Sequence, residues 1–310
     1  MKSLLVVCPV FNEEPVILDF HEELRRALAG VPGWTGRVLY VVDRGTDRSL
    51  DLLRALAGAD PAVSVLSLSS RFGQQAALLA GLDHSDADAV VMLDSDLQHP
   101  PSVIPELVAR HEQGFDVVYT VRERDRSIPL LKRWSARAFY GLLNAVSDTP
   151  IRQGAADFRL LARPVVEVFR TQVRERTLFL RGLVNWVGFR ASGVRFRPGA
   201  RRGGATKYPV GRMLRFALTG LVSFSRFPLR AAGGVGFLLI LLGAATGALA
   251  LADAFEGAPS ERALILTAIF LVGGVQLVFT GVLGEYLGAV LDEARARPHY
   301  IVEERINLGG

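Results

Sequence analysis

The sequence of 310 residues contains one cysteine, Cys8, which lies inside an apolar run. A single thiol cannot form a disulfide within its own chain, so the fold has to be held together without one. One small buried thiol is typical of a protein from a reducing compartment. The apolar start of the chain is too short for a secretory signal, and no small-residue cleavage site follows it, so we expect a first strand there.

Several motifs that mark common enzyme classes are also missing. No G-x-G-x-x-G or G-x-x-x-x-G-K-[ST] follows the predicted strands, which argues against a dinucleotide-dependent dehydrogenase and a P-loop NTPase. Neither H-E-x-x-H nor G-x-S-x-G occurs, which argues against the zinc proteases and serine hydrolases that carry them. The five histidines are scattered, so a zinc site is not expected either.

Acidic residues are absent from one long segment. Between residues 176 and 252 there is no Asp or Glu, while Arg and Lys recur as far as Arg230. A block of this kind favours an anionic partner, such as a phosphate, nucleic acid or membrane headgroups. Nucleic acid is the least favoured of these, because the block lacks interleaved stacking aromatics and leads directly into a long uncharged run.

The first part of the chain alternates apolar strands with amphipathic helices. The strands are predicted over residues 4–10, 37–42, 63–68, 87–93 and 115–120. This order predicts an α/β fold with a mostly parallel, helix-covered sheet. Ligands of such sheets bind outside the C-terminal ends of the strands. The polar loops that fall at this edge are residues 9–14, 43–47, 70–73 and 94–98.

The loop after the fourth strand carries the clearest chemistry. Asp94 and Asp96 are two residues apart in an extended segment, so their side chains point to the same side. Two such carboxylates raise each other's pKa unless a cation lies between them, and hard oxygen ligands suit Mg²⁺ or Mn²⁺ holding a phosphorylated substrate. A solvated turn is the usual meaning of an isolated D-x-D, but the buried strand before this one favours a metal site.

These segments together resemble the family 2 glycosyltransferases, whose fold is the Rossmann-like GT-A fold. Within that family the chain is most similar to the polyprenyl-phosphate glycosyltransferases, relatives of dolichyl-phosphate mannose synthase and the bactoprenol glucosyltransferases. The matching stretches are residues 9–14, 43–47, 72–77, 93–101, 154–161 and 204–208. The sequence departs from the family pattern at Arg44, where a second Asp is usual, and at Arg71, where the loop usually reads Arg-Asn-Phe-Gly. Both changes put an Arg where the base and ribose would lie.

The resemblance also implies roles for individual residues. The positions implied to hold the nucleotide sugar are Pro9, Phe11, Glu13, Asp43, Arg71 and Ser95. The positions implied to bind Mg²⁺ or Mn²⁺, and through it the donor diphosphate, are Asp94, Asp96 and Gln98. The positions implied to approach the acceptor phosphate are Arg122, Lys132, Arg133, Ser135, Arg201 and Lys207. The cation would neutralise charge that builds on the leaving diphosphate.

Asp157 is the third residue that we expect to act in catalysis, together with Asp94 and Asp96. It lies among small and apolar residues, and the resemblance implies that it faces the acceptor. A phosphate acceptor is already anionic, so orientation is the expected role, without strong base catalysis. An ion pair with Arg159 or Arg152 is the alternative.

Simpler roles stay open for other members of the set. Glu13 and Asp43 can serve as helix-start and loop-capping carboxylates. The glycine-rich basic loop 201–208 can lie on anionic headgroups instead of closing over a phosphate. We favour the phosphate role for Arg201 and Lys207, because they match the family pattern.

The C-terminal third predicts contact with a lipid bilayer. Residues 209–230 are basic and amphipathic, which is typical of interfacial helices. The uncharged runs 231–252 and 263–284 are each long enough for a transmembrane helix. Basic residues flank this pair of runs, while the loop between them is acidic on balance, so the positive-inside rule places the catalytic domain and both termini in the cytoplasm, at the plasma membrane. The expected domains are residues 1–208 (catalytic), 209–230 (juxtamembrane helices), 231–288 (two-helix transmembrane hairpin) and 289–310 (tail).

The expected function is inverting transfer of a sugar from a nucleotide-diphosphate sugar, UDP-glucose, to undecaprenyl phosphate for cell-envelope glycosylation. One alternative is a GDP-mannose-dependent polyprenyl-phosphate mannose synthase. Another is a catalytically weakened membrane scaffold or flippase partner, motivated by Arg44 and Arg71. A homo-oligomer is expected by resemblance, with a short terminal strand at residues 298–302 exchanged between protomers.

Overall fold

The computed structural model describes residues 1–122, 155–175, 180–197 and 261–308. The chain forms two compact units. The first comprises residues 1–140, 149–207 and 297–310, and the second comprises residues 141–148 and 208–296. The first unit contains the sheet and is the one that matters for the site.

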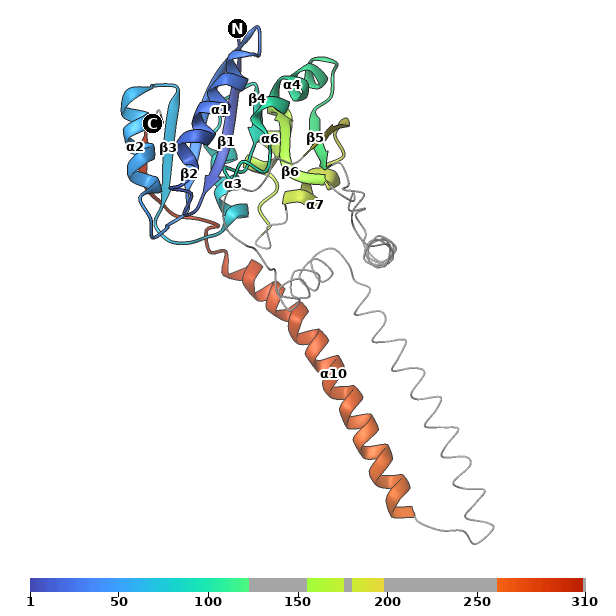
Figure 1. The fold of residues 1–310 in the computed structure, drawn as a ribbon. Helices are drawn as coiled ribbons and strands as arrows, with labels where there is room; N and C mark the ends of the chain where they lie inside the picture. The colour runs from blue at the N-terminus through green and yellow to red at the C-terminus, as the bar shows by residue number, and fades with distance from the viewer. Residues whose placement is uncertain (123–154, 176–179, 198–260, 309–310) are drawn as a thin grey trace. The chain divides into compact units, whose positions relative to one another are not determined.

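The sheet of the first unit has eight strands among the described residues, in the order β7-β5-β6-β4-β1-β2-β3-β8 (Figure 1). Its strands are β1 (Lys2–Val10), β2 (Trp34–Val42), β3 (Val63–Leu68), β4 (Ala89–Met92), β5 (Val117–Arg122), β6 (Ala155–Ala162), β7 (Ala191–Phe196) and β8 (Val302–Ile306). Neighbouring strands are parallel except where β6 or β8 takes part, and these two are antiparallel to their neighbours. The predicted α/β, mostly parallel sheet is therefore confirmed.

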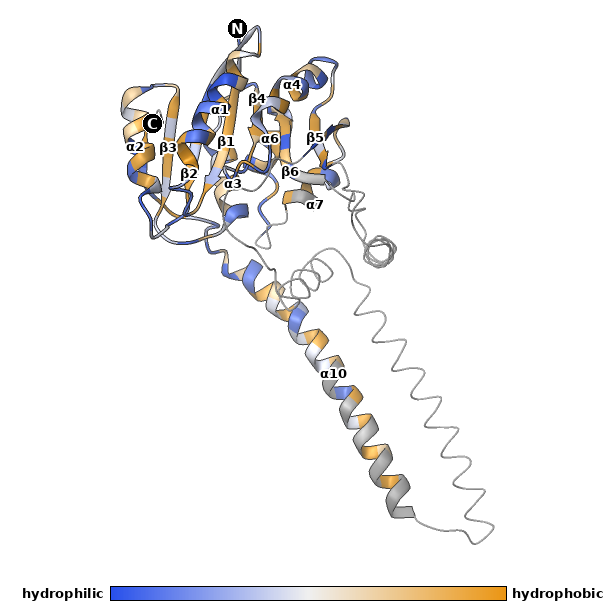
Figure 2. Cartoon of the chain, in the orientation of Figure 1, coloured by the Kyte–Doolittle hydropathy of each residue, from blue (hydrophilic) through white to orange (hydrophobic). Residues whose placement is uncertain are grey.

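Helices cover both faces of this sheet. They are α1 (Ile17–Ala29), α2 (Ser49–Ala59), α3 (Gln74–Asp83), α4 (Ile104–Glu112), α6 (Arg163–Thr171) and α7 (Leu180–Trp186), and the 3₁₀ turn η1 (Pro101–Val103) precedes α4. In β1, the five consecutive residues from Leu4 to Cys8 are buried. Because successive side chains point to opposite faces, both faces must be covered. Figure 2 shows the resulting hydrophobic strands beside helices with hydrophilic outer positions.

Helix α3 is the most deeply buried of these helices. Every residue from Ala76 to Leu82 is buried, and α3 packs against β1, β2 and α6. Gly81 allows this close approach, since a Cβ at that position would collide with the side chain of Val7. The first turn of α3 is therefore carried by a rigid element.

Helix α1 begins later than its sequence predicts. The spacing of Leu18, His21, Leu24 and Leu28 predicts a helix that opens near Phe11, but the helix begins at Ile17. It buries one face, formed by Ile17, Phe20, His21, Leu24 and Ala27. Residues before it form a turn in which the carbonyl of Glu13 accepts hydrogen bonds from the backbone nitrogens of Val16 and Ile17. This turn leaves the loop after β1 free to bond to the loop after β2.

The C-terminal end of the chain adds an edge strand to the sheet. A terminal strand was predicted at residues 298–302, and the structure has it slightly later, as β8, paired with β3 of its own chain. Arg54 forms an ion pair with Glu304 at 2.6 Å. The hydroxyl of Tyr300 donates to Asp83 at 2.7 Å, and burial together with this bond raises the pKa of Tyr300. Exchange of the strand between protomers stays a prediction.

The described residues of the second unit form α10 (Glu261–Arg295). Of the helices that the structure describes, none is long and apolar enough to cross a membrane. The predicted run 263–284 lies inside α10, which continues past it through Glu285 and Asp292, and Figure 2 shows hydrophilic positions among the hydrophobic ones along this helix. Residues 209–230 and 231–252 lie outside the described part. The second predicted transmembrane helix is therefore not supported, and the first stays a prediction.

Candidate active site

The predicted site residues within the described ranges gather at one edge of the sheet. Strands β1 to β5 all end at this edge, and the antiparallel strand β6 begins there. Pairing of Met92 in β4 with Arg159 in β6 places Asp157 beside the loop that carries Asp94 and Asp96. The residues brought to this edge are Pro9, Phe11, Glu13, Asp43, Arg71, Asp94, Ser95, Asp96, Gln98, Arg122 and Asp157. Lys132, Arg133, Ser135, Arg201 and Lys207 lie outside the described residues.

The loop after β1 is bonded to the loop after β2. Asn12 has a left-handed backbone (φ 56°), and its side-chain oxygen accepts a hydrogen bond from the backbone nitrogen of Thr46 at 2.8 Å. A Cβ at Gly45 would collide with the same oxygen, so a larger residue there would displace the Asn12 side chain from this bond. The backbone nitrogen of Glu13 donates to the hydroxyl of Ser49 at 2.9 Å. These bonds show Glu13 at the start of the turn before α1.

Two carboxylates strengthen this junction. Glu14 accepts hydrogen bonds from the backbone and the guanidinium of Arg48, and these bonds lower the pKa of Glu14. Asp47 accepts from the backbone nitrogens of Glu14 and Ser49. Desolvation raises the pKa of Asp47, but the hydrogen bonds outweigh it and the net shift is downward. Asp47 therefore accepts from the first backbone N–H of α2, the bond expected of a capping carboxylate at a helix start.

Asp43 bonds the loop after β2 to the loop after β3. Its carboxylate is buried and accepts hydrogen bonds from the backbone nitrogens of Phe72 at 2.7 Å and Gly73 at 2.8 Å. Gly73 has a positive φ of 92°, which a side chain would disfavour, and it immediately precedes α3. The structure thus shows the loop-capping role of Asp43, and its contact with a nucleotide stays a prediction.

Both arginines that depart from the family pattern have contacts within the chain. The guanidinium carbon of Arg71 lies 4.0 Å from the centroid of the Phe11 ring, a cation–π distance. Arg44 donates a hydrogen bond to the carbonyl of Ser69 at 2.9 Å. Arg71 and Phe11, two positions implied to hold the nucleotide, therefore form one stacked pair.

The D-x-D loop is held by contacts with the start of α3 and the end of β1, and by one contact within the loop itself. Gln74, the first residue of α3, donates from Nε2 to Oδ1 of Asp94 at 2.6 Å. His99 Nδ1 lies 3.5 Å from Oδ2 of the same carboxylate. The buried hydroxyl of Ser95 donates to the carbonyl of Pro9 at 2.9 Å, which joins this loop to the end of β1. The motifs contained Gln74 and His99, but sequence reasoning gave neither residue a role.

The remaining part of the loop joins a residue predicted to bind the metal and sugar donor to a residue predicted to bind the acceptor phosphate. Asp96 accepts a hydrogen bond from the backbone nitrogen of Gln98 at 3.0 Å. The side-chain oxygen of Gln98, a predicted metal ligand, lies 3.3 Å from a guanidinium nitrogen of Arg122, a predicted acceptor residue. Asp157 lies 3.4 Å from Arg159, which is only 2% exposed, so the ion pair considered for Asp157 is present.

The donor atoms at this edge fit a hard divalent cation. No group of three His, Cys, Asp or Glu residues suited to a metal occurs in the described ranges. Asp94, Asp96 and Gln98 nevertheless offer two carboxylates and a carboxamide, and Mg²⁺ commonly takes one or two carboxylates and completes its shell with substrate phosphates. Cys8, near the end of β1, is not offered as a further ligand. Burial and the charge of Asp94 raise the pKa of its thiol, which keeps the thiol protonated.

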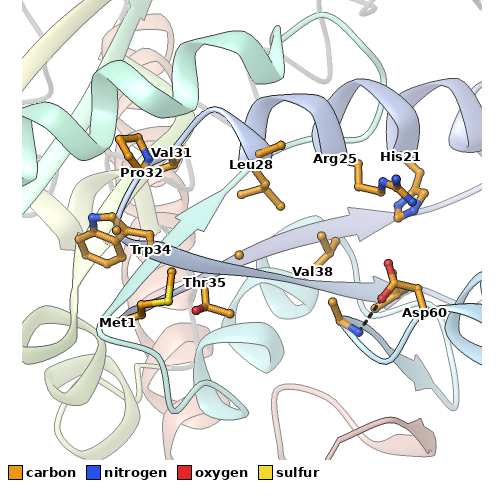
Figure 3. Close-up of a pocket in the computed structure, with 15 residues that line it drawn as sticks. Met1, His21, Arg25, Leu28, Val31, Pro32, Trp34, Thr35, Val38 and Asp60 are labelled. Carbon is orange, nitrogen blue, oxygen red and sulfur yellow. Dashed lines mark hydrogen bonds between the residues drawn. The ribbon is translucent and has the colours of Figure 1, made fainter.

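A pocket of about 540 Å³ lies at the opposite edge of the sheet (Figure 3). It is formed by the end of α1 and the beginnings of β1, β2 and β3, and its lining includes His21, Arg25, Trp34, Val38 and Asp60. None of the predicted site residues lines it. The chemistry therefore gathers at an edge of polar loops, away from this pocket.

Comparison with known proteins identifies the family. The family model described as Glycosyl transferase family 2 matches residues 5–169. The chain is 37% identical over 311 residues to a bactoprenol glucosyl transferase of Shigella phage SfX, covering 98% of this chain and 100% of the relative. It is 35% identical over 310 residues to the uncharacterized glycosyltransferase YkcC of Bacillus subtilis, covering 98% and 94% of the two chains.

A solved structure gives a weaker match. Glucosyl-3-phosphoglycerate synthase from Mycobacterium tuberculosis, crystallised with Mn²⁺, UDP and glucosyl-3-phosphoglycerate, covers 72% of this chain and 79% of its own, with a TM-score of 0.46 and 22% identity. The sequence matches decide the family, because they extend over nearly the whole chain at well above 30% identity. The chain is a glycosyltransferase and belongs to glycosyltransferase family 2.

Proposed function

We propose that this glycosyltransferase moves glucose from UDP-glucose to a polyprenyl phosphate, undecaprenyl phosphate, with inversion at the anomeric carbon. Relatives that match nearly the whole chain are named bactoprenol glucosyl transferases. The structural observation that carries the proposal is the contact between Gln98 and Arg122, because it places a hard oxygen ligand beside a cation suited to a phosphate. A donor diphosphate and an acceptor phosphate can therefore meet at this edge.

The donor half of the site is built from the D-x-D loop. Asp94, Asp96 and Gln98 would hold a divalent cation, Mg²⁺ or Mn²⁺, which when bound neutralises charge on the departing nucleotide diphosphate. The end of β1, with Phe11 and Arg71 stacked on each other, forms the surface proposed for the nucleoside. Bonds between the loops fix these groups before any ligand arrives, so little reorganisation is needed when the donor binds.

The acceptor half is proposed around Arg122 and Asp157. An oxygen of the acceptor phosphate attacks the anomeric carbon, and the bond from that carbon to the diphosphate oxygen breaks, so the nucleotide diphosphate departs with the electron pair. In-line displacement inverts the anomeric centre. The attacking oxygen is already anionic, so Asp157, held by Arg159, serves to orient the acceptor and need not remove a proton.

Because the proposed acceptor is a lipid phosphate, the edge of the sheet that carries the site has to lie close to a membrane surface. We propose that the site lies at the cytoplasmic face of the plasma membrane, where a polyprenyl phosphate exposes its headgroup. A homo-oligomer and a flippase partner stay predictions, and nucleic acid is not proposed as a ligand.

Two other functions are distinguished by the donor test. A GDP-mannose-dependent synthase is the second candidate, because Arg71 on Phe11 changes the surface proposed for the base. A scaffold that has lost its activity is the third, since Arg44 and Arg71 already make contacts within the chain. Retention of Asp94, Asp96 and Asp157 argues against the scaffold.

The decisive experiment is a donor screen. The full chain, purified in detergent, is incubated with Mn²⁺ or Mg²⁺, undecaprenyl phosphate and radiolabelled UDP- or GDP-sugars. Transfer of glucose from UDP-glucose by the wild type but not by Asp96→Ala supports the proposal, with Asp51→Ala on the exposed side of α2 as the matched control. Transfer of mannose from GDP-mannose alone supports the second candidate. No transfer from any donor, with no nucleotide binding, supports the scaffold.

A further inference from the structure

We propose that Gln74 and His99 are positioning residues that hold the carboxylate of Asp94 in the orientation needed to bind the divalent cation. This inference rests on the proposed function, because it assumes a cation at the D-x-D loop. It assigns a role to two side chains that the proposed transfer leaves without one. Gln74 contacts one oxygen of the Asp94 carboxylate and His99 lies near the other.

Gln74 provides the shorter contact. Its side-chain nitrogen donates to Oδ1 of Asp94 at 2.6 Å, a short distance for a bond from a neutral amide to a carboxylate. Each carboxylate oxygen has two lone-pair directions, so this bond leaves Asp94 able to bind a cation. A carboxamide also adds no charge that would compete with the cation.

The backbone of Gln74 is fixed independently of this bond. Residues Phe72 and Gly73, directly before it, are bonded to the buried carboxylate of Asp43. Gln74 is exposed, but the helix that it begins is buried from Ala76 to Leu82 and packs closely on β1 near Val7. A side chain carried by such a rigid element can restrain its partner, whereas a side chain on a loose loop would follow it.

His99, in the same loop as Asp94, lies near the second oxygen. Its Nδ1 lies 3.5 Å from Oδ2 of Asp94. The imidazole ring packs against Phe158 of β6 and Phe196 of β7, with ring centroids 5.8 Å and 5.4 Å away. These aromatic contacts restrain the ring in its place beside the Asp94 carboxylate.

Residues that hold a metal-binding carboxylate affect the affinity for the metal more than they affect the rate of the chemical step. Losing an outer partner of a ligating carboxylate typically weakens metal binding about 10- to 100-fold. Once enough cation is supplied to refill the site, the reacting groups are unchanged. Gln74→Ala and His99→Phe are therefore expected to raise the cation concentration for half-maximal rate, while kcat at saturating cation stays within about threefold of wild type.

The test measures Mn²⁺ binding directly and does not depend on sugar transfer. Free Mn²⁺ is followed by electron paramagnetic resonance while the full chain is titrated with Mn²⁺ in the presence of UDP. Gln75→Ala is the matched control, because Gln75 neighbours Gln74 on α3 but its side-chain oxygen accepts from the backbone nitrogen of Leu180 instead. His99→Phe keeps the aromatic packing, and His99→Asn restores a nitrogen near the position of Nδ1. Melting temperatures show that each variant is folded.

The expected result is Mn²⁺ binding at least tenfold weaker in Gln74→Ala and several-fold weaker in His99→Phe. Binding should be near normal in Gln75→Ala and partly restored in His99→Asn. Binding within twofold of wild type in both folded test variants would overturn the inference, as would a wild-type chain that binds no Mn²⁺ with UDP. Intact Mn²⁺ binding without transfer to any lipid phosphate would instead count against the proposed function and leave this inference standing.

Discussion

The carboxylate of Asp43 lies 2.8 Å from the backbone nitrogen of Gly73, so the loop after β2 is bonded to the residue that precedes α3. A second bond to the neighbouring nitrogen of Phe72 fixes the direction of the loop after β3. One buried side chain therefore sets the shape of a loop that also carries Arg71 and positions Gln74.

Replacing Asp43 with Asn should damage both stability and nucleotide binding. The carboxamide offers one acceptor oxygen, and its amino group then faces a backbone N–H that also needs an acceptor. Losing one hydrogen bond to a buried charged group costs about 1.5–3 kcal/mol, so the free energy of unfolding should fall by roughly that amount. Chemical denaturation measures this loss, and calorimetric titration with UDP and Mn²⁺ should show weaker binding.

The exposed Asp51→Asn on α2 serves as the control for Asp43→Asn. Asp51 pairs with the exposed Arg54, so this change should alter the free energy of unfolding by less than about 1 kcal/mol. Equal effects of the two substitutions would mean that the bonds to Phe72 and Gly73 do not stabilise the loop.

The pair of Glu14 and Arg48 predicts a dependence of stability on acid. Hydrogen bonds from Arg48 place the pKa of Glu14 in the folded state below its ordinary value of 4.5. A depressed carboxyl pKa contributes stability above the ordinary value, and this contribution is lost as the pH falls through the folded-state pKa. Melting temperatures between pH 6 and pH 3 should therefore fall less steeply in Glu14→Gln than in wild type.

Glu22→Gln gives the comparison for that measurement, since Glu22 is an exposed partner of Arg26 on α1. Its acid profile should follow the wild type. An unchanged profile in Glu14→Gln would show that the bonds to Arg48 do not persist in solution.

The stacked pair of Arg71 and Phe11 is expected to bind the base of the nucleotide. Flat guanidinium and aromatic groups both stack on bases, and each stacked base is worth about 1–3 kcal/mol. If the pair forms one platform, Arg71→Ala should weaken UDP binding by about fivefold or more, measured by calorimetry, while Arg26→Ala on the exposed face of α1 should leave it unchanged. Tighter binding in Arg71→Ala would show instead that the guanidinium competes with the base for Phe11.

Much of the fold could be predicted from sequence because it depends on short-range pattern. Strands β1 to β5 follow from apolar runs, and their shared direction follows from the helices between them, so the edge where Asp43, Asp94 and Asp96 meet was predictable. The sequence does not predict strand β6, because the charged residues Asp157 and Arg159 interrupt its apolar pattern. In the structure these two residues form an ion pair, which the sequence alone does not reveal. The start of α1 was placed too early, since the preceding turn is held by bonds to a distant loop.

The roles of Gln74 and His99 were beyond sequence reasoning for a related reason. Gln74 and Asp94 are twenty positions apart, and only the packing of α3 on the sheet brings them together. The same holds for His99, whose ring is oriented by Phe158 and Phe196 from two later strands. Both roles depend on contacts that form only when the chain is folded. A residue's place in a sequence motif shows that it belongs to the site, but not which residue it contacts.

Asp157 offers the sharpest test of the acceptor half of the site. In Asp157→Asn a carboxamide oxygen still faces the buried guanidinium of Arg159, so the fold should survive with a small change in melting temperature. A group that orients the acceptor should, when neutralised, lower kcat/KM for the polyprenyl phosphate by at least tenfold, while Mn²⁺-dependent UDP binding stays unchanged. Initial rates at varied lipid concentration and calorimetry with UDP separate the two. If UDP binding were lost along with transfer, Asp157 would belong to the donor half, and the ion pair with Arg159 would be supporting the D-x-D loop across the β4–β6 pairing instead.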